Sequence, residues 1–154
     1  MAKRSTHSGS IVNTRARYDY DIKHTFTAGI VLSGAETKSL RLGHGHLRGA
    51  FVNIKDNELW LFNATITPTK TNLNAFSEAQ QTAPRKLLVK KRELAELAAG
   101  KEQGLTIIPL KFLTAKKFIK VEIATAKGLK KYDKRQKIKK RDTQRDIDKA
   151  IKRL

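Results

Sequence analysis

Residues 18–32 have the sequence YDYDIKHTFTAGIVL, and this stretch decides the fold class. Its apolar side chains fall on even positions from Tyr18 to Leu32, the odd positions are mostly polar, and His24 interrupts the apolar series once. Side chains of a β-strand point alternately to opposite faces, so a period of two predicts a long half-buried strand. We expect the even-numbered side chains to face the core.

Two further strand pairs are predicted. Residues 51–54 and 59–66 form the first, across a turn in which Asp56 and Asn57 tolerate turn geometry. Residues 59–62 are apolar at consecutive positions and are expected to be buried on both faces. Residues 105–112 and 118–125 form the second pair, and alternation in the latter predicts one buried and one exposed face.

Helices are expected at two places. Ser33 and Glu36 have the spacing of a capping box, which predicts a short helix that stops at Gly43. Pro84 suits a first helical turn and predicts a second helix up to Gly100, after a surface loop over residues 67–83. The first turns of this second helix are basic, which opposes the helix dipole and suggests a bound anion.

At least five strands with short helices predict a mainly β fold. A small, partly open antiparallel β-barrel accommodates this count, and barrels of the OB type commonly bind oligonucleotides. The pattern alone does not distinguish an OB barrel from another small barrel. We divide the chain into a flexible basic arm (residues 1–11), a barrel domain (12–126) and a basic tail (127–154).

Charge indicates the class of partner. The 154 residues contain 33 Lys and Arg against 14 Asp and Glu, a formal net charge of +19. Such an excess opposes compaction and is usually explained by a polyanion. Nucleic acid is favoured over a membrane, since no apolar run approaches the ~18 residues that a span needs. Without cysteines or an apolar signal region, a cytoplasmic protein is expected.

The tail differs from the rest of the chain. Residues 127–154 contain 13 Lys and Arg against 4 Asp, a net charge of +9, and few large aliphatic side chains. We expect this segment to be disordered in isolation. Ile147, Ile151 and Leu154 share helical spacing, so a helix is expected once phosphates neutralise the charge. Tyr132, in a basic run, is suited to stack on an unpaired base.

Neither a metal site nor catalysis is predicted. His44 and His46 supply at most two ligands, whereas catalytic zinc needs about three protein ligands, so both are read as turn residues. Asp19 and Asp21 share a strand face and could in principle hold a nuclease metal, but they alternate with the core face and solvation explains them fully. With no phosphate loop and no Cys–His pair, we expect a protein that is not an enzyme and needs no cofactor.

Six segments carry a resemblance across nearly the whole chain: VNTRARYDY (12–20), AGIVL (28–32), ETKSLR (36–41), RKLL (85–88), KG (127–128) and YDKR (132–135). In this order and spacing they resemble the small tmRNA-binding protein B family (the SsrA-binding protein). The chain departs from the family pattern at Thr27, where an acidic residue is usual, at Thr37 in place of Val, and at Leu129, which removes one charge from the start of the tail.

The resemblance implies an OB-fold barrel that clamps the tRNA-like domain of tmRNA. The tail would enter a stalled ribosome, act at the 16S rRNA of the decoding centre and in the mRNA channel, and allow release of the ribosome and tagging of the incomplete product. The protein itself would perform no chemistry and act as a monomer. The alternative from the residues alone is a ribosomal protein bound permanently to rRNA.

Site residues follow from the resemblance and from charge. We assign RNA binding to Asn13, Arg15, Arg17, Lys38, Arg41, Arg85, Lys86 and Leu88. We assign ribosome binding to the tail residues Lys130, Lys131, Tyr132, Asp133, Lys134, Arg135, Lys139, Lys140 and Ile151.

Overall fold

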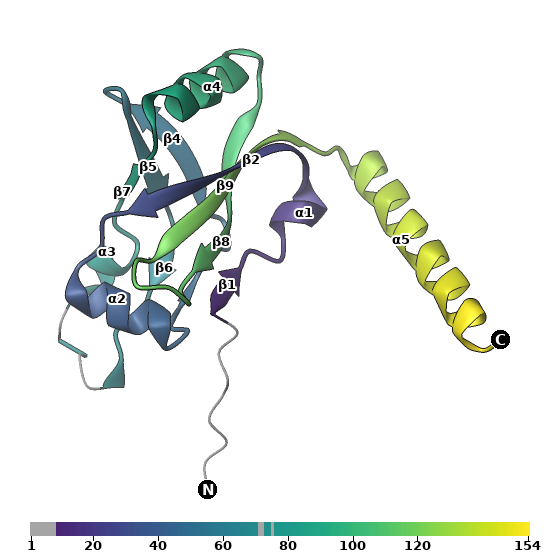
Figure 1. Cartoon of the computed structure of the whole chain (residues 1–154), viewed down its shortest axis with the longest axis horizontal. Helices are drawn as coiled ribbons and strands as arrows, with labels where there is room; N and C mark the ends of the chain where they lie inside the picture. Colours follow the sequence, from purple (N-terminus) through teal and green to yellow (C-terminus); the bar gives the residue numbers. More distant parts are fainter. Residues whose placement is uncertain (1–8, 71–72, 75) are drawn as a thin grey trace, which may run out of the picture.

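The structure, a computed structural model, describes residues 9–70, 73–74 and 76–154 (Figure 1). Most of the predicted arm and three positions of the predicted loop over residues 67–83 lie outside the described residues. The predicted arm is too long by two residues, because Ser10 and Ile11 belong to a strand and Ile11 is buried.

The β-strands form most of the chain between residues 10 and 128, which we call the β-domain. Their bounds are β1 Ser10–Val12, β2 Tyr20–Ile30, β3 Gly45–His46, β4 Phe51–Lys55, β5 Glu58–Phe62, β6 Thr65–Ile66, β7 Arg85–Leu88, β8 Thr106–Leu113 and β9 Lys120–Gly128. Both predicted strand pairs are confirmed, because β4 pairs with β5 and β8 pairs with β9. The strand predicted over residues 59–66 is wrong after Phe62, because Asn63 has φ +59° and Thr65–Ile66 is a separate strand that pairs with β3.

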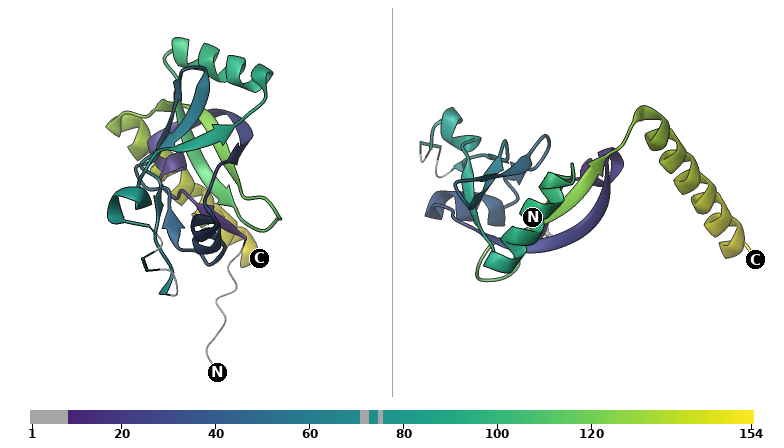
Figure 2. Two further views of the ribbon diagram at one scale, coloured as in Figure 1. Left: turned by 90° about the vertical axis from the view of Figure 1, so that its left-hand side faces the viewer. Right: turned by 90° about the horizontal axis from the view of Figure 1, so that it is seen from above.

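The helices are short except for the last. They are α1 Ala16–Asp19, α2 Gly34–Arg41, α3 Glu78–Gln81, α4 Lys91–Glu102 and α5 Lys131–Lys152. In Figure 2, α5 projects away from the β-domain. No helix in the described part of the chain is long and apolar enough to cross a membrane.

The large sheet has the strand order β1-β8-β4-β5-β7-β2-β9, and all its pairings are antiparallel. β8 also pairs with β9, so the pairings from β8 through β4, β5, β7, β2 and β9 form a closed ring. A separate two-stranded sheet joins β3 to β6. The mainly β class predicted from the sequence is thus observed.

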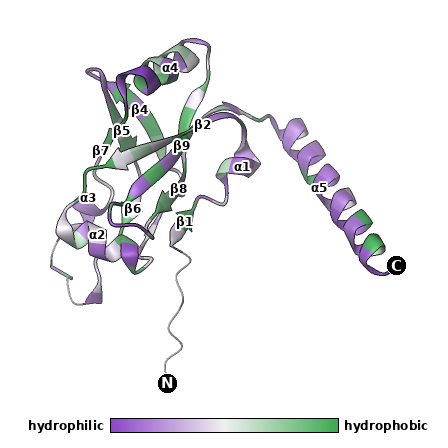
Figure 3. Ribbon diagram, in the orientation of Figure 1, coloured by the Kyte–Doolittle hydropathy of each residue, from purple (hydrophilic) through white to green (hydrophobic). Residues whose placement is uncertain are grey.

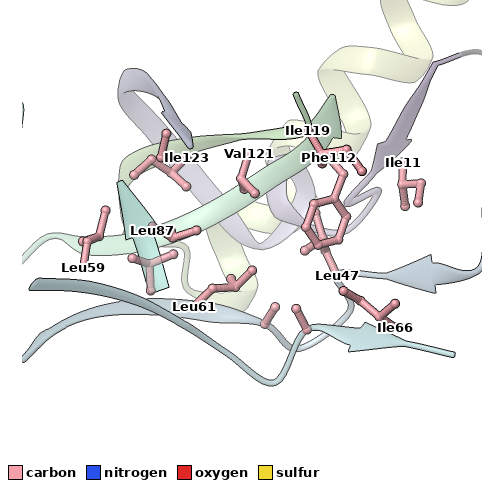
Figure 4. Close-up of a cluster of buried hydrophobic side chains, with 14 of the residues drawn as sticks. Ile11, Leu47, Leu59, Leu61, Ile66, Leu87, Phe112, Ile119, Val121 and Ile123 are labelled. Carbon is pink, nitrogen blue, oxygen red and sulfur yellow. The ribbon is translucent and has the colours of Figure 1, made fainter. Parts of the chain in front are cut away.

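One large hydrophobic cluster fills the inside of this ring. Figure 4 shows side chains from several strands converging there, among them Leu59, Leu61, Phe112 and Ile123. Each of these four is at most 1% exposed. Burying such side chains provides the main stabilisation of a small domain.

A second, smaller cluster lies between β2, β8, β9 and α1, outside the ring. It contains Ala16, Ile108, Leu110, Ala124 and Ala126, with Tyr20 and Ile22 packed against it. The small side chains at Ala124 and Ala126 leave room for α1 against the sheet. This cluster attaches α1 to the β-domain.

A β-bulge in β2 explains why two clusters share one strand. The pairing with β9 shifts between Ile22 and His24, where Ile22 pairs with Ala126 and His24 with Thr125. An extra residue reverses which face each later side chain occupies. Even-numbered residues therefore face the small cluster before the bulge and the main core after it. The predicted single buried face was wrong, and Tyr18 lies in α1 rather than in the strand.

The capping prediction at Ser33 is confirmed in part. The Ser33 hydroxyl accepts a hydrogen bond from the Glu36 amide at 3.2 Å. Gly43, just past the end of α2, has φ +82°, the left-handed conformation expected at a helix stop. The Glu36 carboxylate instead contacts Arg85 at 2.8 Å.

The predicted helix beginning at Pro84 was wrong in its first half. Arg85–Leu88 is strand β7, which lies between β5 and β2, and the helix begins only at Lys91. Arg85 and Leu87 are buried, whereas Lys86 is half-buried and Leu88 exposed. That alternation has the period of a strand. Glu93 accepts a hydrogen bond from the Lys90 amide, so an acid lies in the first turn of α4, where the dipole favours it.

Residues 59–62 are less buried than predicted. Leu59 and Leu61 lie in the core, whereas Trp60 and Phe62 are half-buried on the other face. Phe62 stacks on Phe51 of β4, with 5.3 Å between ring centroids. The turn before them is as expected, with Asp56 and Asn57 at φ +52° and +58°.

Candidate nucleic-acid interface

The predicted RNA-binding residues lie in separate regions of the β-domain. Asn13, Arg15 and Arg17 lie at the start of β2, around α1, whereas Leu88 pairs with Gly29 at the other end of β2. Nine residue steps of a strand span roughly 30 Å. The structure therefore does not bring these residues into one compact site, and a ligand that contacts both regions must extend along β2.

The region around α1 is a groove. It is lined by Asn13, Arg15, Arg48, Phe51 and Ile108 among others, and a neighbouring hollow shares Asn13, Arg15 and Arg48. Arg15, Arg48 and Phe51 are exposed. Two guanidinium groups and an exposed aromatic ring are suited to bind phosphates and stack on a base.

Asn13 fixes the start of this region. Its side-chain amide donates a hydrogen bond to the carbonyl of Pro109 at 3.0 Å, and its backbone amide donates to the carbonyl of Leu110 at 2.7 Å. The side chain is half-buried. Asn13 therefore holds the segment before α1 against β8.

The region around Leu88 combines apolar and basic side chains. Leu88 is 52% exposed and shares a hollow with Gly29, Val89, Lys90 and Lys120. Thr27 and Glu93 line the same hollow. An exposed leucine flanked by lysines is suited to pack against a ribose or base while the ammonium groups contact phosphates.

The predicted basic residues of α2 and β7 differ in the hydrogen bonds and ion pairs that they form. Lys38 and Arg41 lie in α2, and Arg41 donates hydrogen bonds to the carbonyls of Thr114 and Lys117 at 3.1 and 2.6 Å. Lys86 forms an ion pair with Glu58 at 2.7 Å. Arg85 has a different environment altogether.

The Arg85 guanidinium is buried, with the side chain 4% exposed. It donates to the Glu36 carboxylate and to the backbone carbonyls of Ala64, Gln80, Gln81 and Ala83, at 2.8 to 3.2 Å. All its donor nitrogens thus have partners inside the protein. Arg85 joins α2, β7 and the segment around α3.

Within the tail, Lys127 and Gly128 still belong to β9, and Lys131–Lys152 form the 22-residue helix α5, which has no buried residues. Figure 3 shows it as almost entirely hydrophilic, with apolar positions towards its C-terminus. Lys130 is the N-cap, Tyr132 is 70% exposed and Ile151 is 62% exposed. Lys134 is half-buried. The remaining assigned residues are exposed, namely Lys131, Asp133, Arg135, Lys139 and Lys140.

The two aspartates considered for a nuclease site are each paired with a lysine. Asp19 contacts Lys134 at 3.1 Å and Asp21 contacts Lys23 at 2.8 Å. The hydrogen bond and the charge of Lys23 lower the pKa of Asp21 below its usual value. Among the described residues, no group of three or more His, Asp or Glu side chains is placed to hold a metal ion. His44 and His46 are exposed, and the prediction of a turn residue was wrong for His46, which lies in β3.

Sequence reasoning missed Arg48, Phe51 and Lys120 as members of these regions. Arg48 precedes Gly49, whose φ of +75° marks a turn. A basic residue beside a glycine was therefore the signal in the sequence that could have indicated an exposed cation here. Phe51 was assigned to a strand, and nothing in its sequence context showed that its ring is exposed.

Comparison with known proteins identifies the family. The model of the family described as "SmpB protein" matches residues 10–153. The chain belongs to the SmpB protein family. Its curated relatives include the SsrA-binding protein of Pseudomonas putida strain F1, 46% identical over 154 residues that cover 98% of this chain and 96% of the relative.

Two further comparisons agree with this assignment to the SmpB family. The SsrA-binding protein of Chlorobium chlorochromatii strain CaD3 is 46% identical, covering 92% of this chain and 90% of the relative. A solved structure described as "tmRNA-SmpB: a journey to the center of the bacterial ribosome" matches with a TM-score of 0.66 and 36% identity, covering 84% of this chain and 94% of that one.

Proposed function

We propose that this chain binds the tRNA-like domain of tmRNA and delivers it to stalled ribosomes for trans-translation. The observation that carries the proposal is the near full-length similarity to SsrA-binding proteins. It is supported by a β-domain with two exposed basic regions and by an exposed tail helix whose segment has a net charge of +9. The role is binding and delivery, without catalysis by the protein.

In this proposal the β-domain is an OB-type barrel. The closed ring of antiparallel pairings from β8 to β9 supports a small barrel, and OB barrels present one face and the adjacent loops to oligonucleotides. The tRNA-like domain contacts Asn13, Arg15 and Arg17 at one end of β2 and Leu88 with Lys86 at the other, with Lys38 and Arg41 on α2 nearby. Arg85 supports the interface from inside.

The tail acts on the ribosome, at the 16S rRNA of the decoding centre and in the mRNA channel. Its residues have too little apolar surface for a core of their own, which supports disorder in isolation and a helix stabilised by RNA phosphates. Tyr132 stacks on an unpaired base, and Lys130, Lys131, Lys134, Arg135, Lys139 and Lys140 bind phosphates. The protein works in the cytoplasm as a monomer.

A competition gel shift at physiological salt tests the proposal. Labelled tRNA-like domain is mixed with the chain and challenged with excess tRNA and with an unrelated structured RNA. The shift should persist at large excess of both competitors. Equal displacement by every RNA would mean that charge alone drives binding, and the chain would then fit a ribosomal protein better. Co-sedimentation with ribosomes in high salt separates the two, because only a structural ribosomal protein stays bound.

A further inference from the structure

The first turns of α5 lie against α1 through contacts made by two lysines. The Lys134 ammonium group lies 3.1 Å from a carboxylate oxygen of Asp19, the last residue of α1. The Lys137 ammonium group donates hydrogen bonds to the carbonyls of Arg17 and Tyr20. Because residues three apart lie on the same face of a helix, both lysines project to one side of α5.

The connection between β9 and α5 makes a third contact at the same place. The Leu129 amide donates a hydrogen bond to the Asp19 carbonyl at 3.0 Å. Asp19 therefore contacts the tail through both its backbone carbonyl and its side-chain carboxylate. Figure 1 shows α1 as the element of the β-domain next to the start of α5.

α1 itself is firmly attached to the β-domain. Ala16 is 4% exposed and packs into the small cluster with Ile108, Leu110, Ala124 and Ala126. The hydrogen bonds of Asn13 to Pro109 and Leu110 hold the preceding segment. A helix of four residues has too little length to be stable alone, so this packing maintains its shape.

We propose that α1 is a docking site for the tail and that Asp19 and Lys137 are positioning residues. Together with Lys134 they fix the direction in which α5 leaves the β-domain. This inference rests on the proposed function, in which the β-domain holds one RNA and the tail another. A preferred relative angle raises the effective concentration of the second binding part once the first is bound.

The contacts are weak enough to be reversible. The side chains of Lys134 and Asp19 are 28% and 31% exposed. Partly exposed pairs of this kind change an equilibrium by roughly two- to fivefold each. The docked direction is therefore favoured, but RNA phosphates can compete with Asp19 for Lys134 once the tail reaches its site.

Distance measurements on the full chain test the docking. The docking concerns only the first turns of α5, so the label is placed there, and the rest of the tail can be disordered without RNA. The chain has no cysteine, so Ala95→Cys on α4 and Gln136→Cys in the second turn of α5 allow two spin labels at exposed positions. Asp19→Asn and Lys137→Gln should each broaden the distance distribution, with a roughly two- to fivefold fall in the docked-to-undocked ratio. Asp19→Glu should retain the narrow distribution. Glu122→Gln, which removes a carboxylate of β9 paired with Lys111 of β8, is the matched control.

Activity measurements test the positioning role. In a reconstituted system with stalled ribosomes and tmRNA, Asp19→Asn and Lys137→Gln should lower the rescue rate without lowering tmRNA affinity, and Asp19→Glu should retain the rate. An unchanged distance distribution in both variants would overturn the docking. Unchanged rescue despite a broadened distribution would overturn the positioning role. The distance measurement needs no RNA, so failure of the proposed function, seen as no tmRNA binding by the unsubstituted chain, is distinguishable.

Discussion

The Glu36 carboxylate lies 2.8 Å from the Nε atom of Arg85, and this ion pair joins α2 to β7 inside the β-domain. The two residues are 49 positions apart, and both belong to segments that resemble the family pattern. Four backbone carbonyls complete the environment of the guanidinium. The pair therefore stabilises the support beneath the proposed RNA surface.

Arg85→Met should destabilise the protein by about 3–5 kcal/mol, because removing one partner leaves the Glu36 carboxylate and several carbonyls without their donor. Urea unfolding followed by circular dichroism measures this. Lys86→Met is the matched control on the next residue. Its ion pair with Glu58 is about 40% exposed on both sides, so the loss should stay within about 1 kcal/mol. Equal losses in the two variants would contradict the structural role of Arg85.

Leu87 and Leu88 provide a second matched pair on opposite faces of β7. Leu87 is 2% exposed and lies in the core, so Leu87→Ala should cost about 2–5 kcal/mol of stability. Leu88 is 52% exposed, and Leu88→Ala should change stability by about 0.5 kcal/mol or less while weakening tmRNA binding. Unfolding curves and gel shifts on both variants check this. Unchanged tmRNA affinity in Leu88→Ala would remove Leu88 from the interface.

Substitutions in the turn between β4 and β5 should change the stability of the protein and leave RNA binding unchanged. Asn57 has φ +58°, a conformation that asparagine and glycine tolerate and other residues adopt at a cost. Asn57→Ala should therefore lose about 1 kcal/mol, whereas Asn57→Gly should be close to neutral. Thermal unfolding of the two variants separates this conformational effect from loss of the side chain. A similar loss for Gly and Ala would mean that the asparagine side chain itself stabilises the turn.

Tyr132 should act through its ring and not through its hydroxyl. The hydroxyl already accepts a hydrogen bond from Gln136 on the exposed surface of α5. Tyr132→Phe should keep ribosome affinity, and Tyr132→Ala should lose about 1–3 kcal/mol, the usual contribution of base stacking. Filter binding to stalled ribosomes carrying tmRNA measures both. An equal loss for Phe would point to the hydroxyl.

The β-strands were largely predictable because their alternation is local. The two strand pairs and the turn at Asp56 and Asn57 were recognised from residues close together in the chain. The β-bulge that reverses the buried face of β2 was not recognised, because it depends on the register with β9, a hundred residues later in the chain. His24 marked the position, but a single polar residue in an apolar series does not distinguish a bulge from an exposed side chain.

The burial and contacts of the basic residues were less predictable from the sequence than the positions of the strands. Arg85–Leu88 has both helical and strand spacing, and only its place between β5 and β2 decides between them. Arg85 is buried because carbonyls from four other positions surround it, which composition cannot show. The basic tail was recognised as a separate segment because its charge and lack of apolar residues are properties of the sequence itself.

The central claim is a division of labour in which the β-domain binds tmRNA and the tail acts on the ribosome. A chain that stops after Gly128 tests it most directly, because β9 extends to Gly128 and keeps its pairing with Tyr20. Binding to the tRNA-like domain and rescue of stalled ribosomes are measured in parallel with the full chain. The account predicts that tmRNA binding is largely retained while rescue is lost. A loss of tmRNA affinity comparable to the loss of rescue would contradict it.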